Sequence, residues 1–279
     1  MTRLVRGSTV FRLLVAAAAS AAVMAPALGA QSTANVEERT VQYESGSATI
    51  EAFIARPTGQ DRRPAVVVVH DNLGLGRRFR DLTTQLARAG FVAMAPHFPS
   101  RVKTPASEPL DGQPQAAAVA RVPWYESVAD VQRAFAYLEQ DPGVDPAHIS
   151  AIGIGWGEYR VWKLAETTPA LYRAVVFYGV TPTDDDRLAM IRTPVLGHYA
   201  ELDYLITARV LRTKQLLGSR FTYHIYPTVP GFLGGGTGQI QPATGGSVIS
   251  LPAGSHQTSA AAAATLAWTR TLAFLTETY

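Results

Sequence analysis

The sequence predicts an α/β protein built on one doubly wound, mostly parallel β-sheet with helices on both faces. Two observations carry this prediction. The run from Ala65 to Val69 is apolar and rich in β-branched residues, as in strands that are buried on both faces of a parallel sheet. After it, short apolar runs alternate with stretches whose apolar residues have helical spacing. Such alternation is typical of strands joined by helical crossovers, so we expect a single α/β domain over residues 41–279.

The first half of this domain is expected to begin with an antiparallel strand pair. Between residues 41 and 56 polar and apolar residues alternate, with Ala48, Ile50 and Ala52 on one face. The helix that follows the buried strand ends at Gly90. The elements expected here are, in chain order, strand 65–70, helix 77–89, strand 91–95, a Pro-, Ala- and Gln-rich loop at 103–123, and helix 124–139.

The second half continues the same alternation. Its segment 227–257 is rich in Gly, Pro, Ser and Thr and is predicted to be a long loop, with a flexible, glycine-rich insert at 237–255. The other expected elements are strand 148–153, helix 157–167, strands 173–178 and 193–199, helix 208–217, strand 221–226 and helix 258–276.

Residues 1–30 have the composition of a secretory signal peptide. Arginines precede an apolar, alanine-rich run at 13–23, and small residues follow it. A membrane anchor is the alternative, but the run is shorter than the roughly 20 residues that span a bilayer. We therefore expect cleavage after Ala27 or Ala30, a polar linker at 31–40, and a secreted or periplasmic protein without a membrane anchor.

The charge and the cysteine content exclude several functions. The formal charge of +3 arises in the leader, because removing Arg3, Arg6 and Arg12 leaves 22 basic and 22 acidic residues. This balance gives no support to nucleic-acid binding. The absence of cysteine excludes disulfides, cysteine-ligated metals and a thiol nucleophile. We find no metal-binding cluster, phosphate loop or haem motif, and we predict no cofactor.

The chemistry of such a protein is expected where strands end, because ligands of open α/β sheets bind beyond the carboxyl ends of the strands. One strand end reads Gly153-Ile154-Gly155-Trp156-Gly157 and leads into a helix. This is the layout of a nucleophile elbow, G-x-Nuc-x-G, except that the central residue is Gly155. A dinucleotide-binding loop is disfavoured, because Glu158 stands where its third glycine belongs. The other strand ends that matter are 70–72, 96–101 and 199–203.

In the order and spacing of its segments, the chain from about residue 41 resembles secreted members of the dienelactone hydrolase family. The similarity implies an α/β-hydrolase fold and a small-molecule ester, lactone or carboxylate ligand. Members hydrolyse carboxylic esters or lactones with a triad of Cys (or Ser), Asp and His. The matching stretches are VVVVHDNLGL at 66–75, residues 81–96, the elbow, AVVFYG at 174–179, PVLGHY at 194–199 with Asp203, HIYP at 224–227 and LAWTRTLAF at 266–274.

Carried over residue by residue, this resemblance gives an incomplete triad. Asp203 stands at the position of the acid, with the N-cap of a following helix as its alternative role. Gly155 stands at the position of the nucleophile. Gly231, five residues after Tyr226, stands at the position of the histidine.

The resemblance also implies binding groups around the triad. Arg101 matches the arginine that contacts the substrate carboxylate, with a solvated loop arginine as the alternative. Asp71 matches the family's glutamate near the nucleophile. Without a thiolate to act on, it is expected to make a structural hydrogen bond. The N–H of Trp156 and that of Asn72 or Leu73 form the expected oxyanion hole.

Three interpretations of function follow. The first is a catalytically impaired or non-catalytic family member, a pseudoenzyme that binds a small carboxylate or carbonyl ligand. The second is an active hydrolase with a relocated base, His256, and with water or Ser100 as the nucleophile. The third is a structural or partner-binding envelope protein that uses the insert at 237–255.

Overall fold

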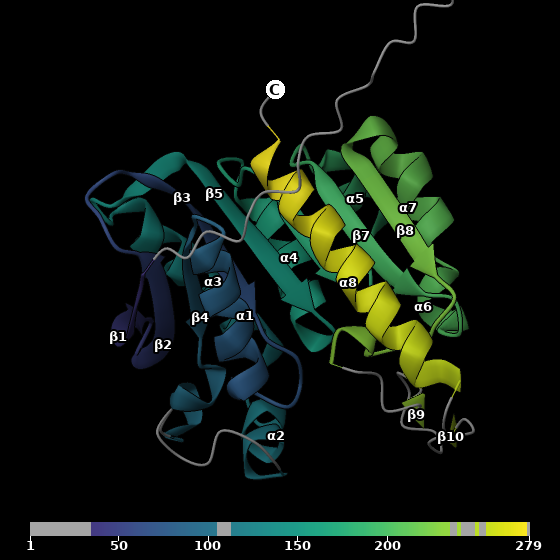
Figure 1. Ribbon diagram of the computed structural model, residues 1–279, viewed down its shortest axis with the longest axis horizontal. Helices are drawn as coiled ribbons and strands as arrows, with labels where there is room; N and C mark the ends of the chain where they lie inside the picture. Colours follow the sequence, from purple (N-terminus) through teal and green to yellow (C-terminus); the bar gives the residue numbers. More distant parts are fainter. Residues whose placement is uncertain (1–34, 105–112, 235–238, 241–248, 251–254, 278–279) are drawn as a thin grey trace, which may run out of the picture. The chain divides into compact units, whose positions relative to one another are not determined.

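The computed structural model describes residues 35–104, 113–234, 239–240, 249–250 and 255–277. Its centre is an eight-stranded sheet with the strand order β1-β2-β4-β3-β5-β6-β7-β8 (Figure 1). The strands are β1 (Val36–Ser45), β2 (Ala48–Pro57), β3 (Arg63–Val69), β4 (Val92–Pro96), β5 (Val144–Ile154), β6 (Ala174–Phe177), β7 (Val195–Ala200) and β8 (Phe221–Tyr226).

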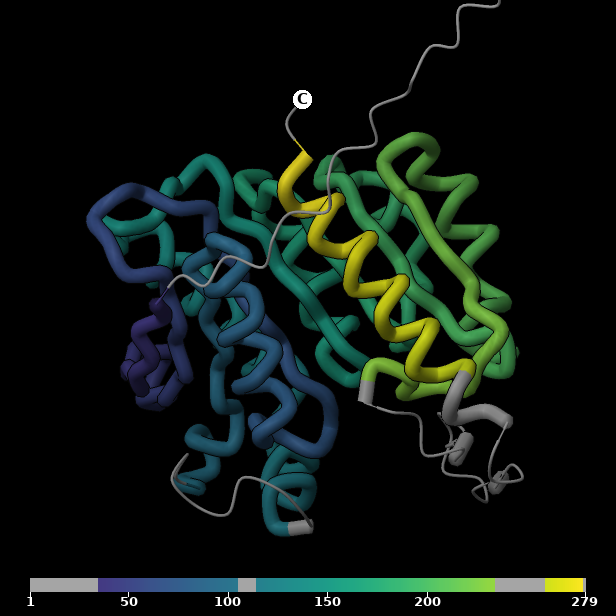
Figure 2. The backbone as a smooth tube through the Cα atoms, in the orientation of Figure 1, coloured from purple at the N-terminus to yellow at the C-terminus, as the bar shows by residue number. Residues whose placement is uncertain are grey.

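The sheet is mostly parallel, as the sequence predicts. β1 and β2 form an antiparallel hairpin, and β2 joins β4 antiparallel. From β4 to β8 every neighbouring pair is parallel. The carboxyl ends of the strands from β4 to β8 therefore lie at one edge of the sheet. Figure 2 shows the strands of the first half of the chain at the left end of the sheet and those of the second half at the right end.

Helices cover both faces, which confirms the doubly wound arrangement. α1 (Arg77–Arg88) and α8 (Ser255–Thr276) lie in front of the sheet in Figure 1. α3 (Trp124–Glu139), α4 (Trp156–Thr167) and α7 (Val210–Leu217) supply buried residues to the opposite face.

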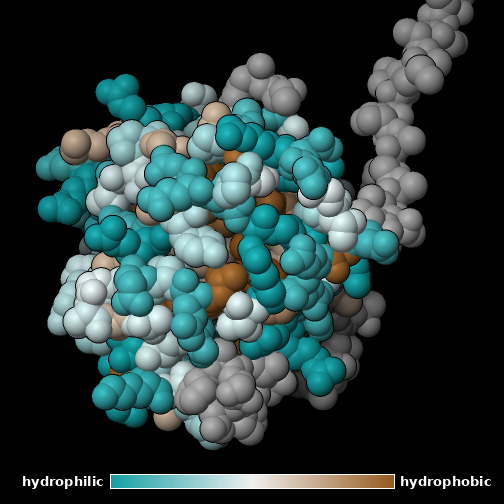
Figure 3. Space-filling model, turned by 90° about the vertical axis from the view of Figure 1, so that its left-hand side faces the viewer, coloured by the Kyte–Doolittle hydropathy of each residue, from teal (hydrophilic) through white to brown (hydrophobic). Residues whose placement is uncertain are grey.

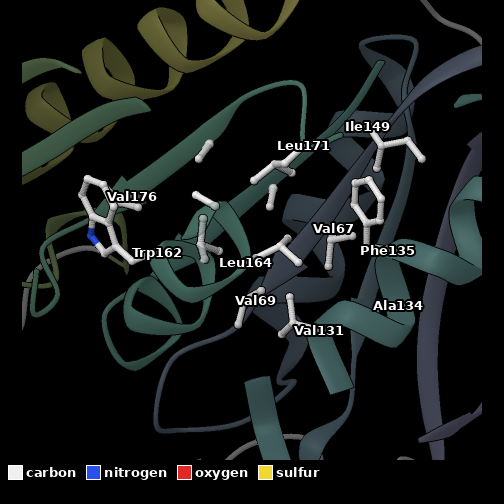
Figure 4. Packing of buried hydrophobic residues seen from close by; sticks show 14 of the residues in the cluster. Val67, Val69, Val131, Ala134, Phe135, Ile149, Trp162, Leu164, Leu171 and Val176 are labelled. Carbon is white, nitrogen blue, oxygen red and sulfur yellow. The ribbon is translucent and has the colours of Figure 1, made fainter. Parts of the chain in front are cut away.

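The alternation of side chains along β3 explains the two-layered core. Val67 and Val69 belong to the cluster under α3 and α4, whereas Val66 and Val68 belong to the cluster under α1 and α8. Figure 4 shows Val67 and Val69 packed with side chains of α3 and α4, including Phe135. All four valines are fully buried. A strand that is apolar at every position is stable only between two helical layers, which is why this run predicted the fold.

The edge strand β1 carries charged residues on its exposed positions. Glu37, Glu38 and Arg39 are exposed there. Figure 3 views the side on which β1 lies, and hydrophilic residues predominate over it. Charged side chains on an edge strand oppose pairing with another chain.

Several element boundaries differ from the sequence prediction. β1 begins at Val36, so residues 36–40 are strand and the prediction of a linker there is wrong. The expected loop at 103–123 contains α2 (Gln113–Ala120), and α8 begins three residues earlier than expected. The short elements that sequence periodicity missed are η1 (Phe98–Val102), α5 (Asp185–Met190), α6 (Tyr204–Thr207), η2 (Gly218–Arg220), η3 (Phe232–Gly234), β9 (Gln239–Ile240) and β10 (Ile249–Ser250).

These elements are too short to show a repeat of apolar residues, and local caps and tertiary packing decide them. The side chain of Asp184, for example, accepts a hydrogen bond from the N–H of Arg187 and begins α5. The expected signal peptide and most of the insert at 237–255 lie outside the described residues. Within the described ranges, no helix has the length and hydropathy to cross a membrane.

Candidate functional site

The strand order reverses at β3, which marks the ligand-binding edge of a sheet of this kind. The chain runs from β3 outward to β4 and then returns to β5 on the other side of β3. The connections that leave these two strands diverge, and open α/β sheets bind their ligands at such a point. The turn after β3, at residues 70–76, and the turn after β5, at Gly155, lie at this edge.

Gly155 keeps the backbone of a nucleophile elbow without its side chain. Its φ and ψ angles are 54° and −112°, and it immediately precedes α4. The N–H of Gly155 donates to the carbonyl of Phe177 at 2.9 Å, which holds the turn against the end of β6. A Cβ atom added here would lie 3.5 Å from the Cβ of Asp71 and 4.0 Å from Cε2 of Tyr178. The elbow therefore has room for a side chain but presents none.

Gly157 permits a close contact of α4 with β3. A Cβ atom at Gly157 would lie 2.3 Å from the carbonyl oxygen of Val69 and 2.7 Å from that of His70. These distances are far below van der Waals contact. Position 157, two residues after Gly155, therefore requires glycine for steric reasons.

Gly231 lies on the turn between β8 and η3. Its φ angle is 74°, and an added Cβ atom would meet nothing within 4 Å. The next residue, Phe232, is fully buried, and its ring centre lies 5.2 Å from that of Tyr178 and 5.3 Å from that of Tyr226. These contacts fix the turn against the end of β6. Gly231, which the resemblance assigns to the position of the histidine, therefore lies on a turn fixed by its neighbour Phe232 and has no side chain.

Asp203 makes the contacts of a helix cap. Its carboxylate accepts a hydrogen bond from the N–H of Ile206 at 3.4 Å, at the start of α6. Burial raises the pKa of Asp203 above its ordinary value, and the Ile206 N–H acts weakly in the opposite direction. The geometry matches the alternative role that we assigned to this residue.

Asp71 makes the structural hydrogen bonds that we expected, and it also uses one of the expected oxyanion donors. Oδ1 accepts from the N–H of Leu73 at 2.8 Å, and Oδ2 pairs with Arg78 at 2.5 Å. Burial raises the pKa of Asp71 despite Arg78. Because the Leu73 N–H is engaged, the backbone of Asn72 and that of Trp156, in the first turn of α4, remain as candidate donors.

Two acidic residues compensate the charge of Arg101 inside the protein. Its guanidinium binds both carboxylate oxygens of Asp130, at 3.0 and 2.5 Å, and lies 3.3 Å from Glu126. Nη2 also donates to the Ser45 carbonyl at 2.9 Å. The hydrogen bond to Asp130 raises the pKa of Arg101. With its charge compensated inside the protein, Arg101 is no longer our candidate for the substrate carboxylate, and it is not a solvated loop arginine either.

Two residues were proposed for a relocated active site, Ser100 as the nucleophile and His256 as the base. Ser100 Oγ lies 2.9 Å from Nδ1 of His97 and accepts from the N–H of Glu51 at 3.3 Å. Nε2 of His97 lies 3.1 Å from the side-chain oxygen of Gln115, and burial lowers the pKa of this histidine. Ser100 is therefore paired with His97 in the structure. His256 lies in α8, and its side chain is outside the described residues.

Two polar side chains at the elbow were not singled out from the sequence as site residues. Glu158 is fully buried and accepts hydrogen bonds from Nε1 of Trp162, at 3.0 Å, and from the N–H of Gly179. Burial raises its pKa to about 7. Tyr178 has a positive φ of 35°, and its buried hydroxyl makes no hydrogen bond of normal geometry with any described residue. Of the two, only Glu158 could have been noticed in the sequence, as a charged residue directly after the glycine-rich turn.

Other ionisable groups near the sheet belong to the core. His198 is buried, with Nδ1 2.9 Å from the Tyr226 hydroxyl and Nε2 3.1 Å from that of Thr271. Burial lowers its pKa to about 3, so it is neutral at physiological pH. In the part of the chain that the structure describes, no three potential metal ligands lie together.

An elbow at the reversal point of an eight-stranded, mostly parallel sheet defines the α/β-hydrolase fold. Within that class, the family model of the dienelactone hydrolase family matches residues 50–279, and the chain belongs to this family.

Relatives and solved structures agree with this assignment. A Methylorubrum extorquens protein assigned as a carboxymethylenebutenolidase is 26% identical over 200 residues, which are 67% of this chain and 69% of that protein. A Bradyrhizobium protein assigned as a 2-oxo-3-(5-oxofuran-2-ylidene)propanoate lactonase is 30% identical over 190 residues, 62% of this chain and 74% of that protein.

Two crystal structures share the fold. That of a protein assigned as a dienelactone hydrolase from Klebsiella pneumoniae is 23% identical, with a TM-score of 0.69, and covers 88% of this chain and all (100%) of its own. That of a dienelactone hydrolase-like promiscuous phosphotriesterase from metagenomic libraries is 19% identical, with a TM-score of 0.66, and covers 86% of this chain and 97% of its own. By family resemblance, the chain is related to ester and lactone hydrolases.

Proposed function

We propose that this member of the dienelactone hydrolase family binds a small carboxylate or carbonyl compound at the elbow and does not hydrolyse it through the family's triad. The observation that carries the proposal is Gly155, which has the elbow backbone, with φ 54° and ψ −112°, and no nucleophilic atom. Covalent hydrolysis needs a nucleophile within hydrogen-bond reach of a base. Gly231 at the position of the base offers no proton acceptor in its side chain.

The groups that remain at the elbow are those that bind an oxyanion or a carboxylate. Trp156 lies in the first turn of α4, where backbone N–H groups have no partner within the helix and the helix dipole favours negative charge. The backbone of Asn72 and the hydroxyl of Tyr178 are further candidate donors. Such donors alone are compatible with a residual acceleration of hydrolysis of about 10³–10⁴ over water.

Hydrolysis of a panel of activated esters and lactones tests this proposal. We expect the purified protein, without residues 1–30, to turn over the panel no faster than its Asp203→Ala variant, because among the described residues the Asp203 carboxylate pairs with the Ile206 N–H and with no histidine. Circular dichroism of both proteins controls for folding. A rate that falls by an order of magnitude or more in Asp203→Ala would establish a working site with a relocated base and would contradict the proposal.

A further inference from the structure

Ser100, His97 and Gln115 form a hydrogen-bonded chain of side chains outside the elbow. Nδ1 of His97 lies 2.9 Å from Ser100 Oγ, and Nε2 lies 3.1 Å from Oε1 of Gln115. A hydroxyl, an imidazole and an acceptor oxygen in this order are the groups of a serine nucleophile, its base and the residue that orients the base. None of the three stands at a position that the resemblance assigns to the family's triad.

The cluster lies at the edge of the sheet where a fold of this kind binds its ligands. His97 directly follows β4, which pairs in parallel with β3, and Ser100 lies in η1. Gln115 lies in α2 and reaches the turn after β3, because a Cβ atom added at Gly74 would lie 3.2 Å from its Oε1. The cluster is therefore held beside the reversal point of the sheet by elements from different parts of the chain.

The hydrogen-bond partners determine where the protons of this cluster lie. The N–H of Glu51 donates to Ser100 Oγ at 3.3 Å, so the serine oxygen is an acceptor towards Glu51 and can direct its own proton to His97. Oε1 of Gln115 accepts from Nε2 of His97, which places the ring proton on Nε2 and leaves Nδ1 as the acceptor. The Ser100 hydroxyl therefore donates to the lone pair of a neutral imidazole, as an activated serine does.

Burial distinguishes the serine from its two partners. His97 and Gln115 are buried, whereas Ser100 is half-buried and is the member of the cluster that reaches the surface. Burial lowers the pKa of His97, with Arg80 acting in the same direction and the Gln115 hydrogen bond and Glu51 acting against it. The imidazole is therefore neutral at pH 7 and can accept a proton.

We propose that Ser100 is a nucleophile towards small carboxylic esters, with His97 as its base and Gln115 as the residue that positions the base. Ser100 Oγ forms a bond with the ester carbonyl carbon, and its proton passes to Nδ1 of His97. The bond from that carbon to the alkoxide breaks, and His97 gives the proton to the departing alkoxide. Water then hydrolyses the acyl-serine with His97 as its base, which frees the acid and restores the hydroxyl. This activity goes beyond the ligand binding that we propose for the elbow.

Methanesulfonyl fluoride tests the inference, because this small reagent modifies nucleophilic serines with loss of fluoride. We expect the wild-type protein to be modified at Ser100, which peptide mass spectrometry locates. His97→Gln should slow the modification about 10²-fold or more, the usual effect of losing a general base. The matched control is His148→Gln, the same substitution at a histidine with a 43% exposed side chain. Its rate of modification should stay within about twofold of wild type.

Two substitutions of Gln115 distinguish positioning of the base from packing. Gln115→Ala removes the acceptor for Nε2 of His97 and should slow the modification at least about tenfold. Gln115→Glu keeps an acceptor oxygen and should restore most of the rate. Equal rates in these two variants would overturn the positioning role. Circular dichroism shows whether each variant is folded, and if His97→Gln does not fold, the comparison of the Gln115 variants decides.

The remaining outcomes separate this inference from the proposed function. An unmodified Ser100, under conditions in which the same reagent inactivates trypsin, overturns the inference, and so does modification that is equally fast in wild type and folded His97→Gln. Ester turnover lost in Ser100→Ala and kept in Asp203→Ala supports the inference and leaves the elbow proposal intact. Turnover that neither substitution changes overturns the inference alone, whereas turnover lost only in Asp203→Ala contradicts both proposals.

Discussion

Glu158 is a carboxyl group whose protonation is set by its place in the fold. It is fully buried beneath the elbow, and burial raises its pKa from 4.5 to about 7. Between these two values the folded protein binds a proton at Glu158 that the unfolded chain does not hold. The contribution of this residue to the free energy of unfolding is therefore largest below pH 4.5 and decreases as the pH rises towards 7.

The first prediction isolates this contribution with Glu158→Gln. The stability difference between wild type and variant should shrink as the pH rises from about 5 to about 7.5, by about 2–3 kcal/mol. Urea unfolding at both pH values measures it. Buried His70 and His198, with pKa values of about 3, lower the stability of the folded protein as the pH falls, which is opposite to the effect of Glu158. Both proteins contain these histidines, so comparing the variant with wild type cancels their effect. A difference that does not change with pH would show that Glu158 titrates at the same pH in both states.

Whether the role of a single residue could be predicted depended on how far away its partner lies in the sequence. Asp71 was predictable as a structural residue, because its hydrogen-bond donor Leu73 is two positions away. Arg101 was not, because Asp130 is 29 positions away and only the docking of α3 brings the two together.

At the scale of elements, the elbow is the most predictable part of the molecule. Strand, glycine turn and helix are contiguous in the sequence, so their local geometry follows from local spacing. The two central glycines nevertheless have different physical roles. Gly157 is needed because β3 approaches within 2.3 Å of an added Cβ atom, whereas Gly155 has space around it and a positive φ.

This difference gives the second prediction. Gly157→Ala should lower the free energy of unfolding by about 3 kcal/mol or more, because the clash is with backbone that cannot rotate away. Gly155→Ala should lower it by about 1–2 kcal/mol, the cost of a left-handed conformation for a residue with a Cβ atom. Denaturant unfolding of the two variants compares them directly. An equal loss in both would mean that α4 and β3 separate easily and that the close contact does not shape the elbow.

At the scale of the whole molecule, the domain was predictable from residue 41 onward and the leader remains a prediction. The signal peptide at 1–30 lies outside the described residues. We predict that a Gram-negative host exports the chain and removes 27 or 30 residues, which intact-mass spectrometry of the exported fraction measures.

The control for this experiment is Leu14→Arg, which interrupts the apolar run and should leave uncleaved protein inside the cell. Full-length wild-type protein in the exported fraction would mean that the leader is an uncleaved anchor. Wild-type protein found only in the cytoplasm would mean that it is not an export signal.

The sequence by itself determined the fold class and the family, and it predicts the loss of the nucleophile and the histidine. Each of these follows from residues that are neighbours in the chain, through the two-sided burial of β3 and the glycine spacing after β5. Only the tertiary structure decided which charges are compensated. Arg101 meets Asp130, 29 positions later in the sequence, because the docking of α3 brings the two side chains together. Ion pairing depends on separations of a few ångströms between residues far apart in sequence, and no local pattern encodes them.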